Sequence, residues 1–270
     1  MLAARRLGVL LLCALALGAV APRPRIVSLI PSLTEDLFAI GAGAQVVGVS
    51  QFTDYPPEAA RVPQVNSFAS VDAEKVLSLH PDVVVGIRAQ APLTADLRRL
   101  GMHPVLLDDD SYADIFTDLA VLGHLSGHER EAAALSAHLR ARAAALQRSV
   151  QSGARPRVFV VLGVAPIFTV GDRSYIAQLL RMAGARNAAA DLPQAYGRYS
   201  AEALVAAQPD AIVADSASEL RSVLGRAPWS TLRAVREHRV YVLDDADLLE
   251  RPGPRFVDGL QWLIAKLHPS

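Results

Sequence analysis

The chain has 270 residues, 51% of them hydrophobic and 20% charged, which is enough for one large domain or two small ones with an ample core. This composition excludes an intrinsically disordered protein. Because 27 basic side chains balance 27 acidic ones, no net field favours binding to nucleic acid or to an anionic membrane.

The first 21 residues are predicted to be a signal peptide. Arg5 and Arg6 precede an apolar stretch over residues 7–21 that ends in small residues, the pattern of a secretory signal. The stretch is shorter than the ~20 residues that a helix needs to cross a bilayer, although a short membrane anchor is the alternative. The only cysteine, Cys13, lies in this segment, so the cleaved chain has no thiol for disulfides or catalysis. We therefore expect a periplasmic or otherwise exported protein.

Residues 22–111 alternate between predicted strands and helices. Residues 25–30 (RIVSLI) form an apolar strand that leads into a helix beginning at Thr34 and Glu35 and ending at Gly41. The later segments are a strand over 46–49, a helix before Pro81, a strand over 83–85, a helix over 95–100 and a strand over 104–107. This alternation favours a parallel, doubly wound sheet, so we expect an N-terminal α/β lobe here.

Residues 112–152 show no strand signal. Apolar residues recur there at helical spacing, which predicts a helical linker that breaks at Gly123 or Gly127 into a short and a long helix. A helix of ~20 residues is ~30 Å long, about the width of a small domain, so we expect it to bridge two lobes. The strand pattern restarts at residues 155–162, and residues 153–270 are predicted to form a C-terminal α/β lobe.

One segment occurs twice: residues 70–85 read SVDAEKVLSLHPDVVV, and residues 200–214 read SAEALVAAQPDAIVA. Each copy has a glutamate, Glu74 or Glu202, near the start of a helix, and a Pro-Asp pair seven residues later. Proline disfavours helix at the residue before it, so each pair marks the break between helix and strand. Helix-dipole interaction next to the N-caps Asp72 and Ser200 explains either glutamate alone. It does not require the same position twice, so the repeat predicts two similar lobes with a cleft between them.

The chain shows no sequence motif of an enzyme. It lacks a G-x-S-x-G elbow and a phosphate-binding loop, and its seven histidines are scattered. His124 and His128 have the spacing of metal ligands on one helical face, but Gly127 separates them and no third ligand is near. We therefore expect no catalytic residues, no metal site and no cofactor. An exported hydrolase or a chelatase is the competing class, and a receptor for free metal ions is a second alternative.

Two acidic clusters, at residues 108–110 and 244–247, follow predicted strands. Loops at the carboxyl ends of strands form the ligand crevice of open α/β sheets, and their carboxylates can hold hard cations. Solvated turns and helix caps are the alternative explanation. Loop aromatics offer rigid apolar contact area to a bulky ligand, or else pack beneath their own loops. These aromatics are Phe52, Tyr55, Phe68, Phe168, Tyr196 and Tyr199.

The chain resembles the periplasmic solute-binding proteins of ABC importers that carry metal chelates, especially those that bind cobalamin. The resemblance covers nearly all of the chain after residue 21. It rests on the two repeated units and on residues 25–35 (RIVSLIPSLTE), 48–58 (GVSQFTDYPPE) and 250–255 (ERPGPR). It implies two Rossmann-like lobes joined by one long helix, with little hinge motion. The ligand held between them would be cobalamin, another corrinoid, a ferric siderophore or haem.

The resemblance also implies roles for individual residues. Glu74 and Glu202 would dock onto arginines of a dimeric ABC permease at the inner membrane. Ligand contacts would come from Phe52, Phe68, Arg88, Phe168, Asp247 and Arg251. The chain departs from the family where Ile87 replaces a tryptophan before Arg88 and where Leu248 and Leu249 replace aromatics, for which Tyr196 and Tyr199 are candidate substitutes. We expect a monomer that is not an enzyme, binds no nucleic acid and delivers a small-molecule chelate to the permease.

Overall fold

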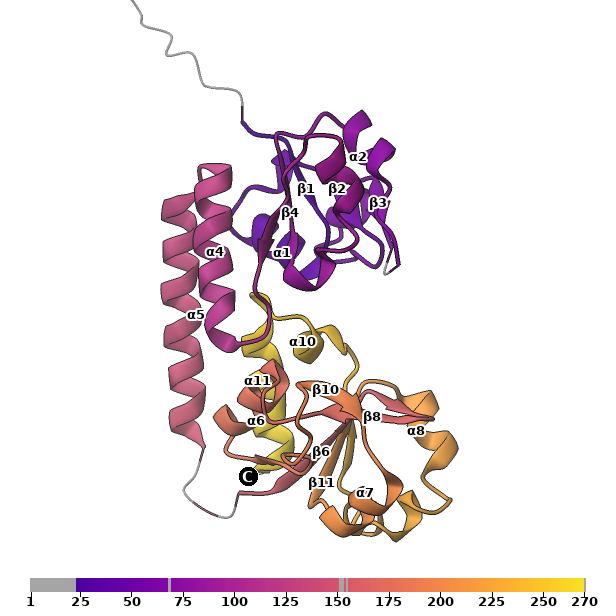
Figure 1. Cartoon of the computed structure of the whole chain (residues 1–270). Helices are drawn as coiled ribbons and strands as arrows, with labels where there is room; N and C mark the ends of the chain where they lie inside the picture. Colours follow the sequence, from indigo (N-terminus) through magenta and orange to yellow (C-terminus); the bar gives the residue numbers. More distant parts are fainter. Residues whose placement is uncertain (1–22, 68, 151–152, 154, 270) are drawn as a thin grey trace, which may run out of the picture.

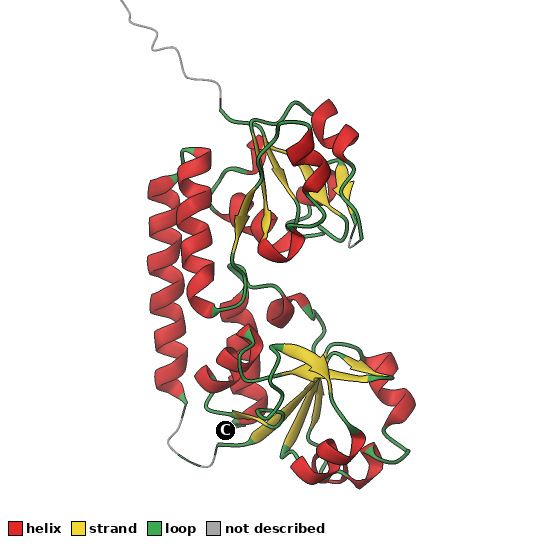
Figure 2. Cartoon of the chain, viewed as in Figure 1, coloured by secondary structure: helices red, strands yellow, loops and turns green. Residues whose placement is uncertain are grey.

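A computed structural model of the protein describes residues 23–67, 69–150, 153 and 155–269. The predicted signal peptide and Phe68 lie outside the described residues. The chain forms two α/β lobes, one above the other, with a pair of long helices along one side of both (Figure 1). The strands are confined to the two lobes (Figure 2). No helix in the described part of the chain combines the length and the apolar character needed to cross a membrane.

The N-terminal lobe is built on a five-stranded sheet in the order β3-β2-β1-β4-β5. Its strands are β1 (Ile26–Ser28), β2 (Val46–Ser50), β3 (Gln64–Asn66), β4 (Val83–Ile87) and β5 (Val105–Leu107). All pairings between these strands are parallel, which confirms the predicted doubly wound architecture. The strand order reverses between β1 and β4, and ligands of such sheets bind outside the carboxyl ends of the strands at this point.

Short helices connect the strands of this lobe: α1 (Pro31–Ala39), α2 (Ala73–Ser78), α3 (Ala95–Arg99), and the 3-10 turns η1 (Gly43–Gln45), η2 (Ala59–Arg61) and η3 (Arg88–Gln90). Helix α1 begins earlier than predicted because Pro31 occupies its first turn. Proline suits that position, since its φ is already helical and its missing N–H would have no partner there. The helix ends before Gly41, whose φ of 88° is left-handed, as the sequence predicted.

The C-terminal lobe repeats this plan with a four-stranded parallel sheet in the order β12-β11-β6-β9. Its strands are β6 (Arg157–Val161), β9 (Arg186–Asn187), β11 (Ala211–Ala214) and β12 (Val240–Val242). A three-stranded antiparallel sheet, which the sequence did not predict, contains β7 (Gly163–Val164), β8 (Ile167–Val170) and β10 (Tyr196–Arg198). The helices are α6 (Tyr175–Met182), α7 (Ala201–Ala207), α8 (Ala217–Val223), η4 (Trp229–Thr231), α9 (Arg233–Arg236), α10 (Asp247–Glu250) and α11 (Phe256–Leu267).

Two antiparallel helices connect the lobes: α4 (Tyr112–Ser126) and α5 (Glu129–Ser149). The break between them falls at Gly127, which has a left-handed φ of 72°. Gly123 lies inside α4 instead, where a Cβ atom would stand only 2.7 Å from the side chain of Ala132 on α5, so glycine permits the close packing of the pair. Helix α5 is about 30 Å long. It is the predicted long connecting helix.

The largest hydrophobic cluster of the described residues runs through both lobes, and each lobe also has a smaller cluster of its own. Buried residues of β1, α4, α5, β6 and α11 form one continuous cluster. Within it, the rings of Tyr112, Phe116 and Phe256 pack edge to face, with centroids 5.1 to 6.1 Å apart. Arg142 of α5 donates to Asp258 of α11 at 2.7 Å. Because packed interiors resist deformation, this shared core supports the expectation of little hinge motion.

The helices of the repeated segment begin and end alike. Asp72 caps α2 by accepting a hydrogen bond from a backbone N–H of the first turn, and Ser200 caps α7 in the same way, as predicted. Each helix is followed by a residue with left-handed φ directly before the proline, His80 (47°) or Gln208 (39°). The proline thus stops both helices by the same backbone geometry.

The aspartates of the two Pro-Asp pairs also act alike. Asp82 accepts a hydrogen bond from the backbone N–H of Arg25 at 2.7 Å, just before β1. Asp210 accepts one from the backbone N–H of Arg157 at 2.8 Å, at the start of β6. Each aspartate therefore ties the strand that follows its helix to the first strand of its lobe, which explains why the motif occurs in both.

Two buried carboxyl groups lie on the helices α1 and α4, which pack together: Asp36 on α1 and Asp118 on α4. Asp36 is fully buried, and neither of its carboxyl oxygens has a hydrogen-bond partner among the described residues. Burial, together with the nearby Asp118 and Glu35, raises its pKa well above the usual value. Burial and the neighbouring aspartates raise the pKa of Asp118 to about 8. The folded protein therefore holds protons here that an unfolded chain releases near pH ~4.

This difference predicts that stability falls as the pH rises from about 4 to about 8, because the folded state binds more protons than the unfolded state over that range. Asp118→Asn removes the titrating group. We expect it to be more stable than the wild type at pH 8 by at least about 1.4 kcal/mol, the equivalent of one pKa unit, in urea unfolding. The exposed Asp244 supplies the control, and Asp244→Asn should keep the wild-type pH dependence. Parallel pH profiles for the wild type and Asp118→Asn would contradict the prediction.

Candidate ligand-binding site

A cavity of about 690 Å³ lies at the carboxyl ends of the strands of the N-terminal lobe. Each strand contributes a following residue to its lining: Pro31 after β1, Phe52 after β2, Ser67 after β3, Gln90 after β4 and Asp109 after β5. Helix α10 and the turn after it close the cavity from the C-terminal lobe. Its volume falls in the range of small-molecule sites, and its position is the one that the reversed strand order favours.

Two side-chain amides shape this cavity, and the sequence analysis missed both. Asn66 and Gln90 each donate to the carbonyl oxygen of Leu29, at 3.0 and 2.8 Å. Gln90 also accepts a hydrogen bond from the backbone N–H of Ile87 at 3.1 Å. The loops after β1, β3 and β4 are thereby fixed to one another. Neither residue carried a sequence signal: Asn66 ends β3, a strand that the sequence analysis did not predict, and Gln90 lies beyond the end of the strand predicted over 83–85.

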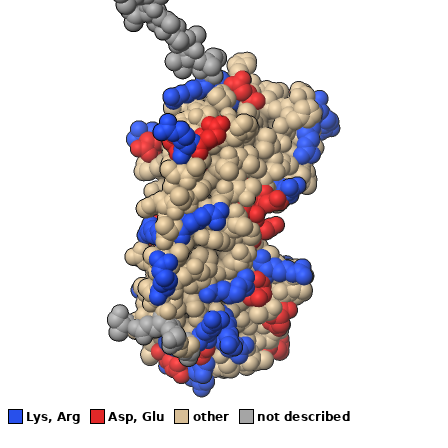
Figure 3. All heavy atoms as spheres, turned by 90° about the vertical axis from the view of Figure 1, so that its left-hand side faces the viewer, with Lys and Arg blue, Asp and Glu red and all other residues tan. Residues whose placement is uncertain are grey.

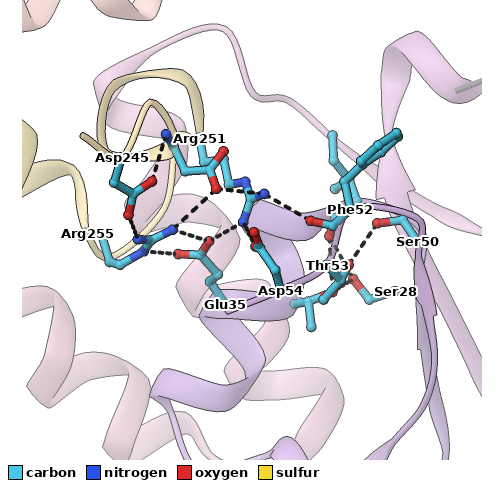
Figure 4. Close-up of polar contacts among 12 residues, drawn as sticks. Ser28, Glu35, Ser50, Phe52, Thr53, Asp54, Asp245, Arg251 and Arg255 are labelled. Carbon is cyan, nitrogen blue, oxygen red and sulfur yellow. Dashed lines mark hydrogen bonds and ion pairs between the residues drawn. The ribbon is translucent and has the colours of Figure 1, made fainter. Parts of the chain in front are cut away.

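The lobes are joined beside the cavity by a buried group of ion pairs (Figure 4). Glu35 of α1, whose side chain is 2% exposed, accepts hydrogen bonds from Arg251 (3.0 Å) and, at 2.8 and 2.9 Å, from Arg255. Arg255 also donates to Asp245 at 2.6 Å. We refer to Glu35, Arg251 and Arg255 as the inter-lobe cluster. It ties the first helix of one lobe to the segment after the last strand of the other.

The terminal nitrogens of Arg251 are fully used by the protein. Nη1 contacts Asp54 at 2.8 Å as well as Glu35, and Nη2 contacts the carbonyl oxygen of Phe52 at 2.9 Å and Asp247 at 2.8 Å. Burial lowers the pKa of Arg251, but hydrogen bonds to these carboxylates outweigh it and raise the pKa overall. Arg251 and Asp247 both line the cavity. Their contact with a ligand stays a prediction.

Phe52 has an unusual backbone at the cavity edge. Its φ of 68° is left-handed, which is rare for a bulky residue and costs about 1–3 kcal/mol. The hydrogen bond from Arg251 to its carbonyl oxygen helps to hold this conformation. The ring is 51% exposed. The inter-lobe cluster therefore also fixes the loop that presents this aromatic side chain.

Four of the predicted aromatics are large exposed side chains: Phe52, Tyr55 (44%), Phe168 (36%) and Tyr196 (38%). The ring of Tyr55 lies over the guanidinium of Arg255, 4.1 Å from its centroid, so it covers the inter-lobe cluster. Phe168 and Tyr196 lie on β8 and β10, on the side of the C-terminal lobe that faces the other lobe (Figure 1).

Tyr199 lies elsewhere. It packs against Phe159, with ring centroids 5.6 Å apart, and its hydroxyl donates to Asp191 at 2.8 Å. It lines a larger hollow, of about 850 Å³, at the outer end of the C-terminal lobe. That hollow is bordered by arginines and alanines and has no exposed large aromatic among its lining residues. The inter-lobe cavity therefore remains the candidate site.

The positions where the chain departs from the resemblance have ordinary structural roles. Arg88 is exposed at the end of β4 and pairs with Asp108, while the next residues along the chain line the cavity. Leu249 is buried in the main core, and Leu248 packs against that core. Neither leucine lines the cavity.

Acidic groups line the part of the cavity nearest the lobe junction. Burial, followed by the neighbouring Asp110, Asp114 and Asp108, raises the pKa of Asp109 to about 6. Burial and the charge of the nearby Asp215 raise the pKa of Glu250 to about 7. Near neutral pH these two carboxyls are thus partly protonated and can donate as well as accept hydrogen bonds.

The two histidines with metal-ligand spacing have separate partners. His124 contacts Glu129 at 3.3 Å, whereas the Nδ1 atom of His128 lies 3.0 Å from the carbonyl oxygen of Ser126. Within the described ranges, no three His, Cys, Asp or Glu side chains are grouped so that they could hold a metal ion.

Glu74 and Glu202 occupy equivalent places in the two lobes. Each is exposed and lies in the first turn of its helix, α2 or α7. Figure 1 shows these helices at opposite ends of the molecule. A partner that contacts both must therefore span both lobes.

Comparison with known proteins identifies the family. The description of the matching family is "periplasmic binding protein", and it covers residues 26–246. The chain belongs to this family. A vitamin B12-binding protein of Vibrio cholerae is 30% identical over 248 residues, 91% of this chain and 90% of its own. An uncharacterized ABC transporter substrate-binding lipoprotein of Bacillus subtilis, YvrC, is 32% identical over 255 residues, 91% of this chain and 80% of its own.

Solved structures of this periplasmic binding protein family show the same fold. The periplasmic vitamin B12 binding protein BtuF of Vibrio cholerae matches with a TM-score of 0.82 at 29% identity, covering 91% of this chain and 97% of that one. The periplasmic heme-binding protein RhuT of Roseiflexus matches with a TM-score of 0.81 at 28% identity, covering 92% and 98%. The chain is thus a substrate-binding protein of the ABC-transporter type, related to proteins that bind vitamin B12 or haem.

Removing the central carboxylate of the inter-lobe cluster tests its energetic weight. Glu35→Ala leaves Arg251 and Arg255 buried without their shared partner, so we expect the free energy of unfolding to fall by about 3–5 kcal/mol. Urea unfolding followed by circular dichroism measures this loss. The half-exposed pair of Arg142 and Asp258 supplies the control, because Asp258→Ala should change stability by only about 1 kcal/mol or less. If both variants lower the free energy of unfolding by a similar amount, the inter-lobe cluster stabilises the fold no more than an ordinary surface ion pair does.

Proposed function

We propose that this substrate-binding protein is exported, captures cobalamin or a related corrinoid, and delivers it as a monomer to an ABC permease dimer. It acts by binding and not by catalysis. The family relationship and the cavity between two α/β lobes support the general function. The choice of ligand depends on the chemistry of the cavity wall.

The charge of the cavity wall is the observation that favours a corrinoid over the other ligands. Among the residues that the structure describes, four carboxyl groups line the cavity: Asp54, Asp109, Asp247 and Glu250. Arg251 is the only cation among these described lining residues, and it already has partners for all of its terminal N–H groups. Such a wall favours a ligand that is neutral on this side and rich in N–H donors. The primary amides around a corrin ring have this character. The carboxylates of haem, and the negatively charged oxygens of a ferric catecholate siderophore, would be repelled by the carboxyl groups of the wall.

Haem is the second candidate, because structural neighbours at similar identity include heme-binding proteins. Exposed rings such as Phe52 and Phe168 would suit any large flat macrocycle. The two ligands differ chiefly in the groups at the edge of the ring. A comparison of affinities therefore separates them.

Isothermal titration calorimetry with purified protein is the test of the ligand. We expect cyanocobalamin to bind at least about tenfold more tightly than hemin or a ferric hydroxamate siderophore, a difference of about 1.4 kcal/mol. The variant Phe52→Ala should weaken cyanocobalamin binding without loss of stability, because the ring is largely exposed. Preferred binding of hemin would replace the corrinoid assignment with the haem one.

The docking role proposed for Glu74 and Glu202 predicts a separation of transport from binding. The double variant Glu74→Lys, Glu202→Lys should abolish uptake of labelled ligand by cells, because both anchors would repel the permease arginines that they are proposed to meet. Ligand affinity of the purified protein should stay within about twofold, since neither residue lines the cavity. The exposed pair Glu58 and Glu131 provides the control, and its reversal should leave uptake intact. Loss of ligand binding in the Glu74, Glu202 variant would refute the docking role.

A further inference from the structure

The antiparallel sheet of the C-terminal lobe carries three exposed side chains on one face. Phe168 of β8 stands directly opposite Arg198 of β10, and Val170 stands opposite Tyr196. Directly opposed residues share a face of the sheet, and so do residues two apart along a strand. Phe168, Arg198 and Tyr196 therefore lie on one face, and all three are exposed. Thr169 points the other way and is buried.

This face borders the N-terminal lobe. The pKa of the Tyr196 hydroxyl is raised, first by burial and then by Asp109 and Asp110, which follow β5 of the other lobe, and by Glu250 of α10. Strand β10, which carries Tyr196, lies on the side of the C-terminal lobe that faces the other lobe (Figure 1). Since Arg198 and Phe168 share its face, they extend the same wall outward from the lobe junction.

Arg198 has no partner in the described part of the chain. It lines a hollow of about 570 Å³ with Phe168 and the β7–β8 hairpin. Glu219 lines the same hollow, but neither it nor any other described acidic side chain lies within ion-pairing distance of Arg198. Arg251, the cation across the gap, is fully engaged. Arg198 is thus a cation that remains available for a ligand on this face of the sheet.

The two sides of the gap also differ in charge. The outline of the molecule is indented at mid-height, with acidic side chains along the upper margin and basic ones at the lower margin (Figure 3). The N-terminal lobe supplies Asp54 and Asp109 to the cavity wall, and helix α10 of the C-terminal lobe supplies Asp247 and Glu250. A ligand that extends from this cavity to the antiparallel sheet therefore meets carboxyl groups in the cavity and the guanidinium of Arg198 on the sheet.

We propose that Arg198 binds an anionic group of the ligand, a phosphodiester or a carboxylate, while Phe168 and Tyr196 contact the adjoining ring. The inference rests on the proposed function, because it requires a ligand between the lobes. A guanidinium presents two parallel N–H groups that match the oxygens of either anion. Arg198 would thereby set the orientation of the ligand, with its anionic side towards the C-terminal lobe and its neutral, donor-rich side towards the other.

Ligand pairs that differ in the anionic group give the test. Cyanocobalamin carries a phosphodiester in its nucleotide loop, and dicyanocobinamide lacks that loop. Hemin carries two carboxylates, which are masked in its dimethyl ester. The test uses whichever of the two pairs the wild-type protein binds. For the anionic member of that pair, we expect Arg198→Gln to lower the affinity measured by calorimetry by roughly 10- to 100-fold. Binding of the neutral member should stay within about twofold.

Matched variants exclude a merely structural effect. Arg236 is an exposed arginine on α9 that lines none of these hollows, and Arg236→Gln should leave both affinities unchanged. Glu219→Gln should act in the opposite direction and strengthen binding of the anionic member, because it removes a negative charge from the same hollow. Urea unfolding of Arg198→Gln should match the wild type.

The outcomes separate this inference from the proposed function. If Arg198→Gln weakens both members of a pair equally, or neither, the anion-binding role is wrong while a ligand site between the lobes stands. If the wild type binds the hemin pair and not the corrinoids, the corrinoid assignment fails and the anion role is decided by the hemin pair. If the wild type binds none of the four compounds, both proposals fail.

Discussion

The buried carboxylate of Glu35 between Arg251 and Arg255 is the interaction on which the arrangement of this protein depends. An unpaired charge at that depth would cost several kcal/mol, so the buried Glu35 requires its arginine partners in place. Glu35 belongs to the first helix of the chain, and the arginines belong to its last segments. The fold therefore closes by joining its two ends across the gap between the lobes, next to the cavity.

The same contacts determine the chemistry of the cavity. The terminal N–H groups of Arg251 already contact Glu35, Asp54, Asp247 and the Phe52 carbonyl oxygen. Arg251 therefore cannot also bind an anionic ligand without losing one of these contacts. The carboxyl groups around it then dominate the cavity wall, and its hydrogen bond to the Phe52 carbonyl helps to hold the left-handed turn that displays the Phe52 ring. Selectivity for a ligand that is neutral on this side would follow from the stability of the closed fold.

Local patterns were sufficient to predict the lobes but not the contacts between them. The alternation of apolar runs with Gly and Pro predicted the parallel sheets, and the Pro-Asp repeat predicted equivalent helix ends, because both depend on a few neighbouring residues. The antiparallel sheet escaped prediction because β7 and β10 are too short to show a periodic pattern. Glu35 read as an ordinary helix-start residue, since its partners lie more than two hundred positions away. Phe52 was recognised by its loop context, but the loop expectation was wrong for Phe168 and Tyr196, which lie on strands β8 and β10. Asn66, Gln90 and Arg198 carried no comparable signal.

A rigid junction has a consequence for release of a ligand. Three features resist bending at the junction: the inter-lobe cluster, the core that is shared by both lobes, and the helix pair of α4 and α5. Spontaneous opening of the lobes would therefore have to break buried ion pairs and expose apolar surface. A partner that binds both ends of the molecule at once would apply force far from the junction, where it acts most strongly on these contacts. Glu74 and Glu202 lie on helices at opposite ends, which is where such forces would act most effectively (Figure 1). In the proposed function, the permease would then loosen the cleft by straining the lobes apart, and the ligand would leave without a large hinge motion of the free protein.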